Sequence, residues 1–544
     1  MKGRPVPPRK RATATPAAPS TMKELKDTLW KAADKLRGSM DASQYKNVVL
    51  GLVFLKYVFD AFTERREQIR VELEAQDYDD EQIEQIVDDV DEYTGSGVFW
   101  IPAEARWTYL AENAKGSGDV TIGSLIDEAM NQIMLANPAL KATLPRIFNQ
   151  ASVDQRRLGE LLDLLNGTRF TGAGASRARD LLGEVYEYFL EKFAKAEGKR
   201  GGEFYTPASV VRVLVEVLEP TSGRVYDPCC GSGGMFVQTE KFLEAHNQDR
   251  TAIAVYGQEL NERTWRMAKM NLAIHGLNAN LGSVWGDTFA RDLHPQLTGH
   301  EGADYVLANP PFNIKDWARN DEDARWRFGV PPAGNANYAW LQHILSKLRP
   351  GGVAGVVLAN GSMSSNSGGE GKIRAQLVEA DLVSCMVALP TQLFRSTGIP
   401  VCLWFFTRGK GNRKRGSIDR SGQVLFIDAR SLGYMVDRAE RSFTDDDIAT
   451  IANTYRAWRG TDSAREAGLT YADKPGFSYS ATLAEVKAAD YALTPGRYVG
   501  AVDVEDDREP IAEKIERLTK ELYLQFDESE RLAQVVREKL SSLS

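Results

Sequence analysis

Seven short apolar segments alternate with stretches long enough to form helices between about residue 220 and residue 410. The segments are "RVYDP" (224–228), "AVYGQE" (254–259), "SVWGD" (283–287), "ADYVLANP" (303–310), "GGVAGVVLA" (351–359), "VSCMVALP" (383–390) and "VCLWFFTR" (401–408). Strands joined by crossover helices are typical of a parallel sheet with helices on both faces. We therefore predict an α/β domain with a doubly wound, mostly parallel sheet over residues 166–410.

The chain before this domain has two parts. Residues 1–21 are basic and lack the apolar stretch of a signal peptide. We expect them to form a disordered tail, with an arm that contacts DNA as the alternative. Residues 22–165 are predicted to be a helical domain, since their apolar residues follow the helical period. The apolar run at 47–62 is interrupted by Lys56 and Asp60, which indicates a core helix rather than a membrane span.

The chain after residue 410 is expected to form a mixed extension over 411–505 and a helix over 506–544. Apolar residues of that helix are spaced as in a short coiled coil: Ile511, Ile515, Leu518 and Leu522. A seam of this length is not stable alone. We therefore expect this helix to pack on a partner or back on its own domain.

The composition is typical of a protein in a reducing cytoplasm and limits how this chain can bind nucleic acid. Only four cysteines and five scattered histidines occur in 544 residues, so neither a disulfide framework nor a metal site is predicted. The net charge of −8 argues against binding DNA over a large surface unaided. A DNA role would require a local basic patch or a basic partner.

A glycine-rich turn follows the first predicted strand, in "RVYDPCCGSGGMF". The strand ends at Asp227, and the turn contains Gly231, Ser232, Gly233 and Gly234. Glycines let the backbone approach a ligand closely, and the next helix presents free N–H groups. Because ligands of open α/β sheets lie at the carboxyl ends of strands, a nucleotide-like cofactor is predicted here.

Acidic residues end the next two predicted strands. Glu259 could accept both hydroxyls of a ribose, and Asp287 could accept a proton from an exocyclic amine. An acid after a strand is often only a helix cap. Together with the glycine-rich turn, however, three successive strand ends predict one cofactor site.

The fourth predicted strand ends in "LANPPFNIKD" (307–316). Pro310 and Pro311 exclude a regular helix, so the Pro310 carbonyl is left available as an acceptor. Asn309 adds an amide oxygen, and Phe312 adds a ring that can stack. Two acceptors and a ring suit a planar group that carries an NH₂, such as adenine.

This set of residues resembles S-adenosylmethionine-dependent amino-methyltransferases, and "NPPF" resembles the signature of the DNA adenine-N6 enzymes. The resemblance implies that Ser232, Gly233 and Gly234 hold the methionine part of the cofactor. It also implies that Glu259 binds the ribose and that Asp287 contacts the adenine. The upstream "GEFYTP" resembles the segment that contacts the carboxylate end of the cofactor, which adds Glu203, Phe204, Tyr205, Thr206, Pro207 and Ala208.

More narrowly, the chain resembles the modification subunit of type I restriction–modification systems over about residues 22–540. The helical segment 29–60, the "GEFYTP" and "NPPF" pair and the late "YALTPGRYVG" (491–500) carry this resemblance. It implies double-stranded DNA as substrate, a separate specificity subunit and a second copy of this chain as partners. A restriction subunit is a further partner that it leaves open.

The resemblance also implies a mechanism in which the target adenine leaves the DNA stack. Asn309 and the Pro310 carbonyl would accept hydrogen bonds from the amino group while Phe312 stacks on the base. Three alternatives stay open: methylation of cytosine N4, methylation of a protein glutamine, and an assembly subunit that binds cofactor without catalysis. A cysteine nucleophile is disfavoured, because Cys229 lies in the cofactor turn rather than at the substrate-bearing strand end.

Overall fold

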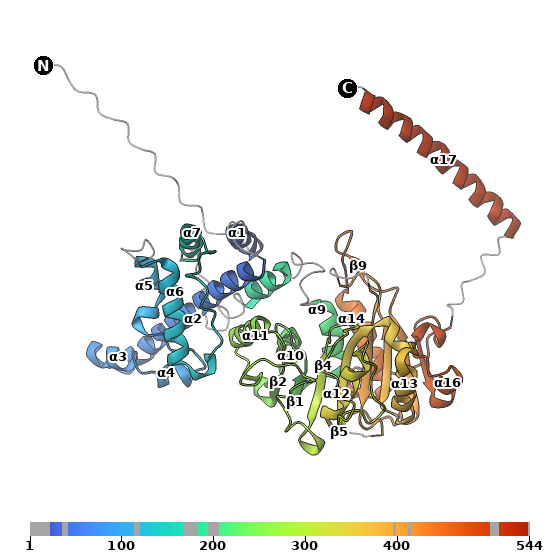
Figure 1. Ribbon diagram of the computed structural model, residues 1–544, viewed down its shortest axis with the longest axis horizontal. Helices are drawn as coiled ribbons and strands as arrows, with labels where there is room; N and C mark the ends of the chain where they lie inside the picture. The colour runs from blue at the N-terminus through green and yellow to red at the C-terminus, as the bar shows by residue number, and fades with distance from the viewer. Residues whose placement is uncertain are drawn as a thin grey trace.

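The N-terminal part of the protein is helical in the computed structural model, which describes residues 22–34, 42–113, 120–166, 183–193, 206–394, 399–411, 415–500 and 511–541. Its helices are α1 (Met22–Asp34), α2 (Ala42–Glu74), α3 (Asp80–Ile86), α4 (Asp91–Thr94), α5 (Trp107–Glu112), α6 (Ile122–Ala136) and α7 (Gln155–Asn166). The long α2 crosses the centre of this bundle (Figure 1). Its segment 48–55 is entirely buried, as expected for a core helix that is apolar on most faces.

The described chain from residue 206 to residue 500 builds a nine-stranded sheet (Figure 1). Its strands are β1 (Gly223–Asp227), β2 (Ile253–Gly257), β3 (Ala279–Asn280), β4 (Ala303–Ala308), β5 (Leu348–Ala359), β6 (Val383–Ala388), β7 (Val401–Thr407), β8 (Gln423–Asp428) and β11 (Ser478–Thr482). A separate hairpin consists of β9 (Tyr434–Met435) and β10 (Arg441–Ser442).

The strand order is β11-β8-β6-β7-β5-β4-β1-β2-β3. Parallel pairing joins β1 to β2 and β4, β2 to β3, β4 to β5 and β6 to β8. Only β7, between β5 and β6, and the edge strand β11 run antiparallel to their neighbours. The predicted doubly wound, mostly parallel sheet is therefore confirmed.

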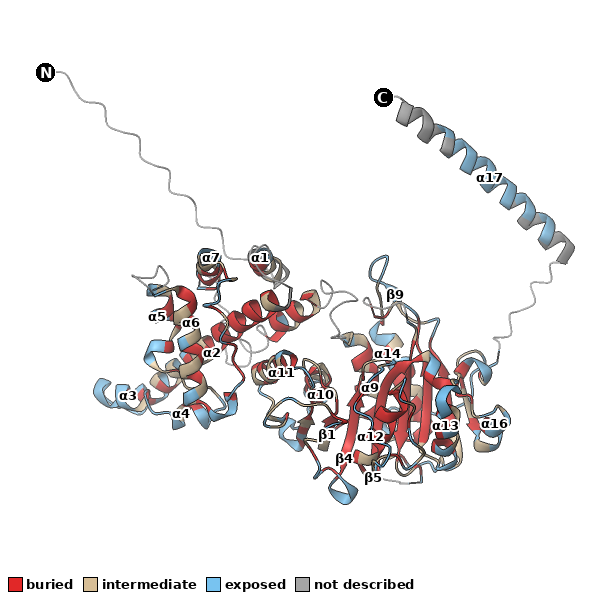
Figure 2. Ribbon diagram, viewed as in Figure 1, coloured by how far each residue is buried: buried red, intermediate tan, exposed pale blue. Residues whose placement is uncertain are grey.

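Helices cover both faces of this sheet, because side chains along a strand alternate between faces. Val225 and Tyr305 share one core with α9 (Ala208–Leu218), α10 (Gly234–Ala245) and α14 (Asp445–Arg459). Tyr226 and Val306 share the opposite core with helices of the other layer. Those helices are α12 (Asn337–Lys347), α13 (Glu370–Glu379) and α16 (Leu483–Ala488). The buried strands form the centre of this three-layer body (Figure 2).

Helix α11 (Glu262–Ile274) belongs to both parts of the molecule. Its Trp265, Ala268 and Leu272 pack in the core on one face of the sheet. Its Met267 and Met270 pack instead in the core of the N-terminal helices, together with residues of the helix 183–193. The N-terminal bundle and the sheet are therefore joined through the helix that follows β2.

The strand predicted at 283–287 is wrong, because β3 is confined to Ala279–Asn280. Gly282 adopts a left-handed conformation with φ 75°, which turns the chain away from the sheet. Beyond the expected boundary near residue 410, β8 and β11 extend the same sheet. The predicted basic tail 1–21 lies outside the described residues.

The C-terminal helix α17 (Ile511–Ser541) stands apart from the rest of the chain (Figure 1). Its described apolar side chains include Ile515, Leu522 and Phe526, and all three are exposed. Within the ranges given above, no helix has the length and hydropathy needed to cross a membrane.

Candidate active site

The order of the strands reverses at β1, because β2 and β3 lie on one side of it and β4 lies on the other. Such a switch point is where open α/β sheets bind ligands, at the carboxyl ends of the strands. A cavity of about 680 Å³ lies there. It is lined by the turns after β1, β2 and β4, by the loop after β3, and by residues of the N-terminal bundle.

The structure brings six of the predicted site residues together in this cavity: Gly231, Ser232, Glu259, Asp287, Asn309 and Pro311. Eight others are described but do not line it: Thr206, Pro207, Ala208, Asp227, Gly233, Gly234, Pro310 and Phe312. The remaining three, Glu203, Phe204 and Tyr205, lie outside the described residues.

The turn after β1 requires its glycines. Gly231 and Gly233 have φ 55° and 84°, a left-handed conformation that side chains other than glycine rarely adopt. Asp227 fixes the start of the turn by accepting the Cys229 N–H at 3.0 Å. Burial, together with the charge of Glu259, raises the pKa of Asp227 to about 7. Asp227 therefore stabilises the turn from a buried position outside the cavity lining.

Glu259 at the end of β2 is held by two backbone groups. One carboxylate oxygen accepts the N–H of Gly231 at 3.0 Å, and the other accepts the N–H of Asn261 at 2.8 Å. These bonds fix the orientation of the carboxylate at the wall of the cavity, where it can face hydroxyl groups of a ligand.

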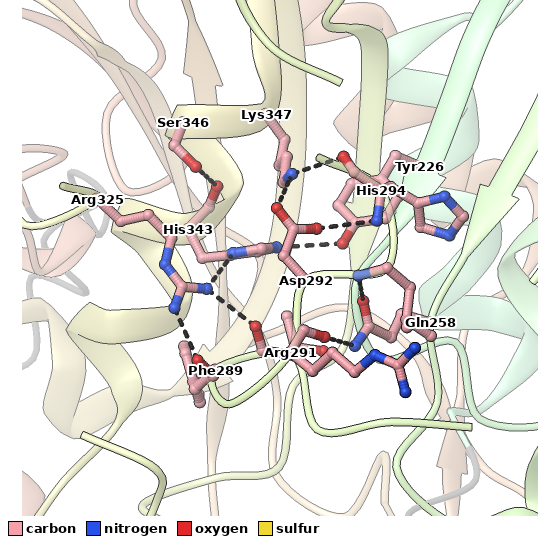
Figure 3. Close-up of polar contacts among 12 residues, drawn as sticks. Tyr226, Gln258, Phe289, Arg291, Asp292, His294, Arg325, His343, Ser346 and Lys347 are labelled. Atoms are coloured by element: carbon pink, nitrogen blue, oxygen red, sulfur yellow. Dashed lines mark hydrogen bonds and ion pairs between the residues drawn. The ribbon is translucent and has the colours of Figure 1, made fainter. Parts of the chain in front are cut away.

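Asp287 reaches the cavity from a loop rather than from a strand end. Side chains replace the missing strand pairing: Gln258 donates to the carbonyl oxygens of Gly286 at 3.0 Å and Arg291 at 2.8 Å (Figure 3). Gln258 also accepts the N–H of Leu293 at 3.1 Å. These bonds tie the loop 286–293 to the end of β2, next to Glu259.

A half-buried arginine, Arg325, holds the same loop from the other side (Figure 3). Arg325 donates to the carbonyl oxygens of Thr288 and Phe289, both at 2.9 Å. It also donates to Nδ1 of His343 at 3.0 Å, so Nε2 of His343 carries the proton and donates to the Tyr226 hydroxyl at 3.1 Å. Burial and the Arg325 charge keep the pKa of His343 far below its usual value. This histidine is a neutral structural link.

The cavity has apolar walls that the sequence patterns did not predict. Phe289, Trp317 and Trp340 line it, with the Phe289 ring centroid 4.4 Å from Trp340 and 4.9 Å from Trp317. Leu260, directly after Glu259, also lines it and is 64% exposed. Phe289 could have been found from its place two residues after Asp287. The two tryptophans carry no local signal, because only the fold brings them there.

The side-chain amide of Asn309, directly after β4, is held in one orientation. Its amide nitrogen donates to the Thr206 hydroxyl at 2.8 Å, which leaves its amide oxygen facing away from that bond. The oxygen is buried and accepts no hydrogen bond from the residues that the structure describes. A buried acceptor without a partner is costly unless a ligand supplies the donor. Asn309 is therefore suited to receive an NH group.

The turn that carries Asn309 is fixed by a pair of amides. Asn313, which has φ 54°, donates its N–H to the Asn337 side chain at 3.0 Å. Asn337 in turn donates to the Asn313 side-chain oxygen at 2.9 Å. Phe312 packs against Phe394, with ring centroids 5.9 Å apart at 74°. In this structure Phe312 therefore belongs to the core that borders the cavity rather than to its lining.

Cys229 lines the cavity, but its chemistry differs from that of a nucleophile. Burial raises the pKa of its thiol well above the usual value, and the charges of Asp227 and Glu259 raise it further. A thiol attacks as the thiolate, so this environment disfavours a cysteine mechanism. Over the described chain, no group of three His, Cys, Asp or Glu side chains could hold a metal ion.

Comparison with known proteins identifies the family. Residues 177–507 match the N-6 DNA methylase family, and residues 25–165 match the HsdM N-terminal domain. The methylase subunit of the type I restriction enzyme HindI from Haemophilus influenzae is 46% identical over 463 residues, which cover 81% of this chain and 99% of that protein. The MjaIX methylase subunit from Methanocaldococcus jannaschii is 38% identical, covering 96% of this chain and 91% of that protein.

A solved structure has the same architecture. The methyltransferase subunit of a type I restriction–modification system from Streptococcus thermophilus superposes with a TM-score of 0.71 at 25% identity, covering 88% of this chain and 100% of that one. The sheet is thus that of the S-adenosylmethionine-dependent methyltransferases, preceded by a helical region. The chain belongs to the family of type I restriction enzyme methylase subunits, whose catalytic part is an N-6 DNA methylase.

Proposed function

We propose that Asn309 orients the N6 amino group of a DNA adenine for methylation and that S-adenosylmethionine binds beside it in the same cavity. The observation that carries this proposal is the amide oxygen of Asn309, which is buried and has no hydrogen-bond partner among the described residues. Only a group with an N–H or O–H can satisfy this oxygen. An adenine amino group supplies such a donor, and N6 of adenine is the atom that this enzyme family modifies.

The residues around the cavity fit the cofactor. Glu259 would accept hydrogen bonds from the ribose hydroxyls. Ser232 and its neighbouring glycines would contact the methionine part of the cofactor. Asp287 would accept a hydrogen bond from the amino group of the cofactor's adenine. Leu260 and Phe289 offer apolar contacts for the flat adenine ring. When bound, S-adenosylmethionine supplies an electrophilic methyl group on its sulfonium.

The chain's own part in catalysis is then positioning and charge complementarity. The Asn309 oxygen accepts one hydrogen of the amino group, and the Pro310 carbonyl accepts the other. Both bonds strengthen as positive charge develops on the nitrogen during methylation. The target base must leave the helix to reach them, and Phe312 would turn from Phe394 toward the base or border it from its present place.

The amide is held so that it presents oxygen rather than nitrogen. Thr206 accepts from the Asn309 nitrogen, and the Asn313–Asn337 pair holds the turn. Together with the Pro310 carbonyl this oxygen would offer two acceptors, which suit the two hydrogens of an amino group better than the single hydrogen of a hydroxyl. Cytosine N4 and a glutamine amide carry the same group, so the substrate assignment rests on the family.

A separate specificity subunit and a second copy of this chain are the proposed partners on DNA, in the cytoplasm. The net charge of −8 supports a division of labour in which another chain supplies much of the DNA contact. The exposed apolar residues of α17 suit assembly. Deleting residues 510–544 should weaken assembly with the specificity subunit while cofactor binding persists, and unchanged assembly in size-exclusion chromatography would refute that role.

The direct test is sequencing of modified bases in DNA from cells that express this chain with its neighbouring subunits. N6-methyladenine at one recurring sequence is the expected result, and it should vanish with Asn309→Ala. Methylated cytosine, or unmodified DNA from a complex that binds cofactor, would overturn the proposal. The second of these results would favour an assembly subunit without catalysis.

A further inference from the structure

The hairpin of β9 and β10 presents three consecutive apolar side chains to solvent. Tyr434, Met435 and Val436 are 51%, 41% and 52% exposed. Over the described residues, only α17 has another such run of exposed large apolar side chains. Single exposed apolar residues are ordinary, whereas clustered ones mark a surface that a partner covers. The hairpin is therefore a candidate interaction surface.

The hairpin is anchored at its root and fixed at its turn. In the turn between the two strands, Asp437 accepts the N–H groups of Ala439 at 2.7 Å and Glu440 at 3.0 Å. At the root, Phe443 belongs to the core on one face of the sheet, and Leu432 packs against that core. Between root and turn the chain stands out from the body of the sheet domain (Figures 1 and 2). The exposed residues are thus carried by a supported structure.

The hairpin rises from the same edge of the sheet as the catalytic turns. β8 runs parallel to β6, β5 and β6 both run antiparallel to β7, and β4 runs parallel to β5. The carboxyl ends of β4, β6 and β8 therefore lie at one edge, and the hairpin follows β8 there. Four strand spacings, about 19 Å, separate β8 from β4. A ligand that reaches both Asn309 and the hairpin must therefore be a macromolecule.

The hairpin also contacts the segment that packs on the substrate turn. Gln392, after β6, accepts the N–H of Arg441 at 2.8 Å and donates its side chain to the carbonyl oxygen of Arg438 at 3.4 Å. Two residues further along the chain, Phe394 packs on Phe312 of the "NPPF" turn, with ring centroids 5.9 Å apart. A continuous row of contacts thus joins the hairpin to the turn after β4.

Double-stranded DNA is the partner that this position favours. An adenine reaches the cavity only after it leaves the base stack, and the unstacking is costly. Proteins that distort DNA insert apolar side chains such as methionine between base steps and place arginines in the minor groove. Tyr434 and Met435 offer the apolar side chains, and Arg438 in the turn of the hairpin offers an exposed cation.

We propose that the β9–β10 hairpin inserts Tyr434 and Met435 into the DNA beside the target adenine and stabilises the duplex after the base has left it. Arg438 then contacts the DNA backbone next to the insertion. This inference depends on the proposed function, because it assumes that the adenine leaves the duplex and enters the cavity at Asn309.

The test compares two duplexes that differ only in whether the target adenine is paired. Both carry the sequence found by sequencing of modified bases, and in one of them the base opposite the target adenine is missing, so that extrusion costs less. Single-turnover methylation is measured with the complex of the full chain and the specificity subunit. The chain is used as wild type and as the double variant Tyr434→Ser, Met435→Ser.

The double variant should methylate the paired duplex roughly 10- to 100-fold more slowly than the wild type, because it no longer offsets the cost of unstacking. On the duplex with the unpaired adenine its rate should stay within about threefold of the wild type, since most of that cost is absent. The conservative double variant Tyr434→Phe, Met435→Leu keeps the apolar surface and should methylate both duplexes as the wild type does.

Ile418→Ser is the matched control. Ile418 is 39% exposed but precedes β8, at the opposite edge of the sheet from the hairpin. This variant should methylate both duplexes at the wild-type rate. Size-exclusion chromatography and thermal unfolding show for each variant that the complex assembles and that the chain is folded.

Three results would overturn the inference. An unchanged rate on the paired duplex would mean that the hairpin does not insert into DNA during the reaction. An equal loss on both duplexes, in a folded and assembled complex, would mean that the hairpin does not assist extrusion of the base. Loss of assembly would mean that the hairpin binds the specificity subunit instead.

Failure of the proposed function has a different signature. Asn309→Ala should be inactive on both duplexes, because the lost acceptor is needed after the base has entered the cavity. Recovery of Asn309→Ala on the duplex with the unpaired adenine would refute the role proposed for Asn309, while the comparison of the hairpin variants would still hold.

Discussion

The proposed cofactor side of the cavity, formed by the turns after β1 and β2 and the loop after β3, differs from the proposed substrate side, formed by the turn after β4, in whether its acceptors already receive hydrogen bonds. On the cofactor side, Glu259 and Asp287 already accept backbone N–H groups, from Gly231 at 3.0 Å and from Phe289 at 2.7 Å. On the substrate side, the Asn309 oxygen is buried and accepts none from the part of the chain that the structure describes. Preorganised carboxylates suit a ligand that binds tightly, and an unsatisfied oxygen suits a group that arrives only for the reaction.

The two turns also differ in how they are held. The turn after β1 is held by its own glycines, by Asp227 beside it and by Glu259, which follows Gly231 by 28 residues. The turn after β4 has partners on both sides along the chain, since Thr206 precedes Asn309 by 103 residues and Asn337 follows Asn313 by 24. Substitutions should therefore separate binding of the cofactor from transfer of the methyl group.

The largest expected effect is that of Asn309→Ala. It removes the acceptor that contacts the reacting amino group, so methyl transfer should fall by at least about 10²- to 10³-fold. Cofactor affinity should stay within about twofold, because Glu259 and the glycine-rich turn are unchanged. Single-turnover methylation and calorimetric titration measure the two quantities. A parallel loss of cofactor affinity would remove the distinction between the turns.

Glu259→Ala should produce the opposite pattern. It removes the proposed ribose acceptor and leaves the N–H groups of Gly231 and Asn261 without the carboxylate that they contact. Cofactor affinity should therefore fall by roughly 10- to 100-fold. At saturating cofactor, the rate of methyl transfer should recover much of the wild-type value. If saturation does not restore the rate, Glu259 also contributes to the reaction step.

Thr206→Val tests whether the remote partner of Asn309 matters. Valine has a similar shape but cannot accept from the amide nitrogen, so the amide can rotate and present nitrogen instead of oxygen. We expect about a tenfold lower rate of methyl transfer with unchanged cofactor affinity. Thr206→Ser, which keeps the hydroxyl, is the control and should restore the rate. Equal rates for valine and serine would show that Asn309 is oriented by other contacts.

The smallest effect concerns the support of the cofactor turn. Burial raises the pKa of Asp227 to about 7, so the folded protein binds this proton more tightly than the unfolded chain does. The stability that Asp227 contributes is therefore present at low pH and is lost as the pH rises from about 4 to about 7.

Asp227→Asn removes this titration and keeps an oxygen for the Cys229 N–H. The melting temperature of the variant relative to wild type should thus rise across that pH range and then level off, as thermal unfolding at a series of pH values would show. Parallel melting curves would mean that Asp227 is already ionised in the folded protein.

Residues near the strand ends were predicted where the signal was local. Three of these signals can be recognised in the sequence: the glycine-rich turn, the acid shortly after β2 and the "NPPF" motif. Each contributes one residue to the lining of the cavity, namely Gly231, Glu259 and Asn309. Asp287 lies in the cavity as predicted, although the strand predicted before it is wrong. Hydrogen bonds from Gln258 and Arg325 hold its loop in place of strand pairing. Nothing near Trp317, Trp340 or Lys46 predicts that they line the same cavity.

The sequence by itself determined the alternation of strands and helices, the glycine-rich turn and the acceptor after the fourth strand, because periodicity and backbone conformation are properties of short segments. Only the tertiary structure decided which acceptor is left unsatisfied. The Asn309 oxygen stays without a donor because Thr206, far away in sequence, binds the nitrogen of the same amide. The tertiary structure alone also placed Lys46 in the cavity, since burial against a remote domain leaves no local pattern.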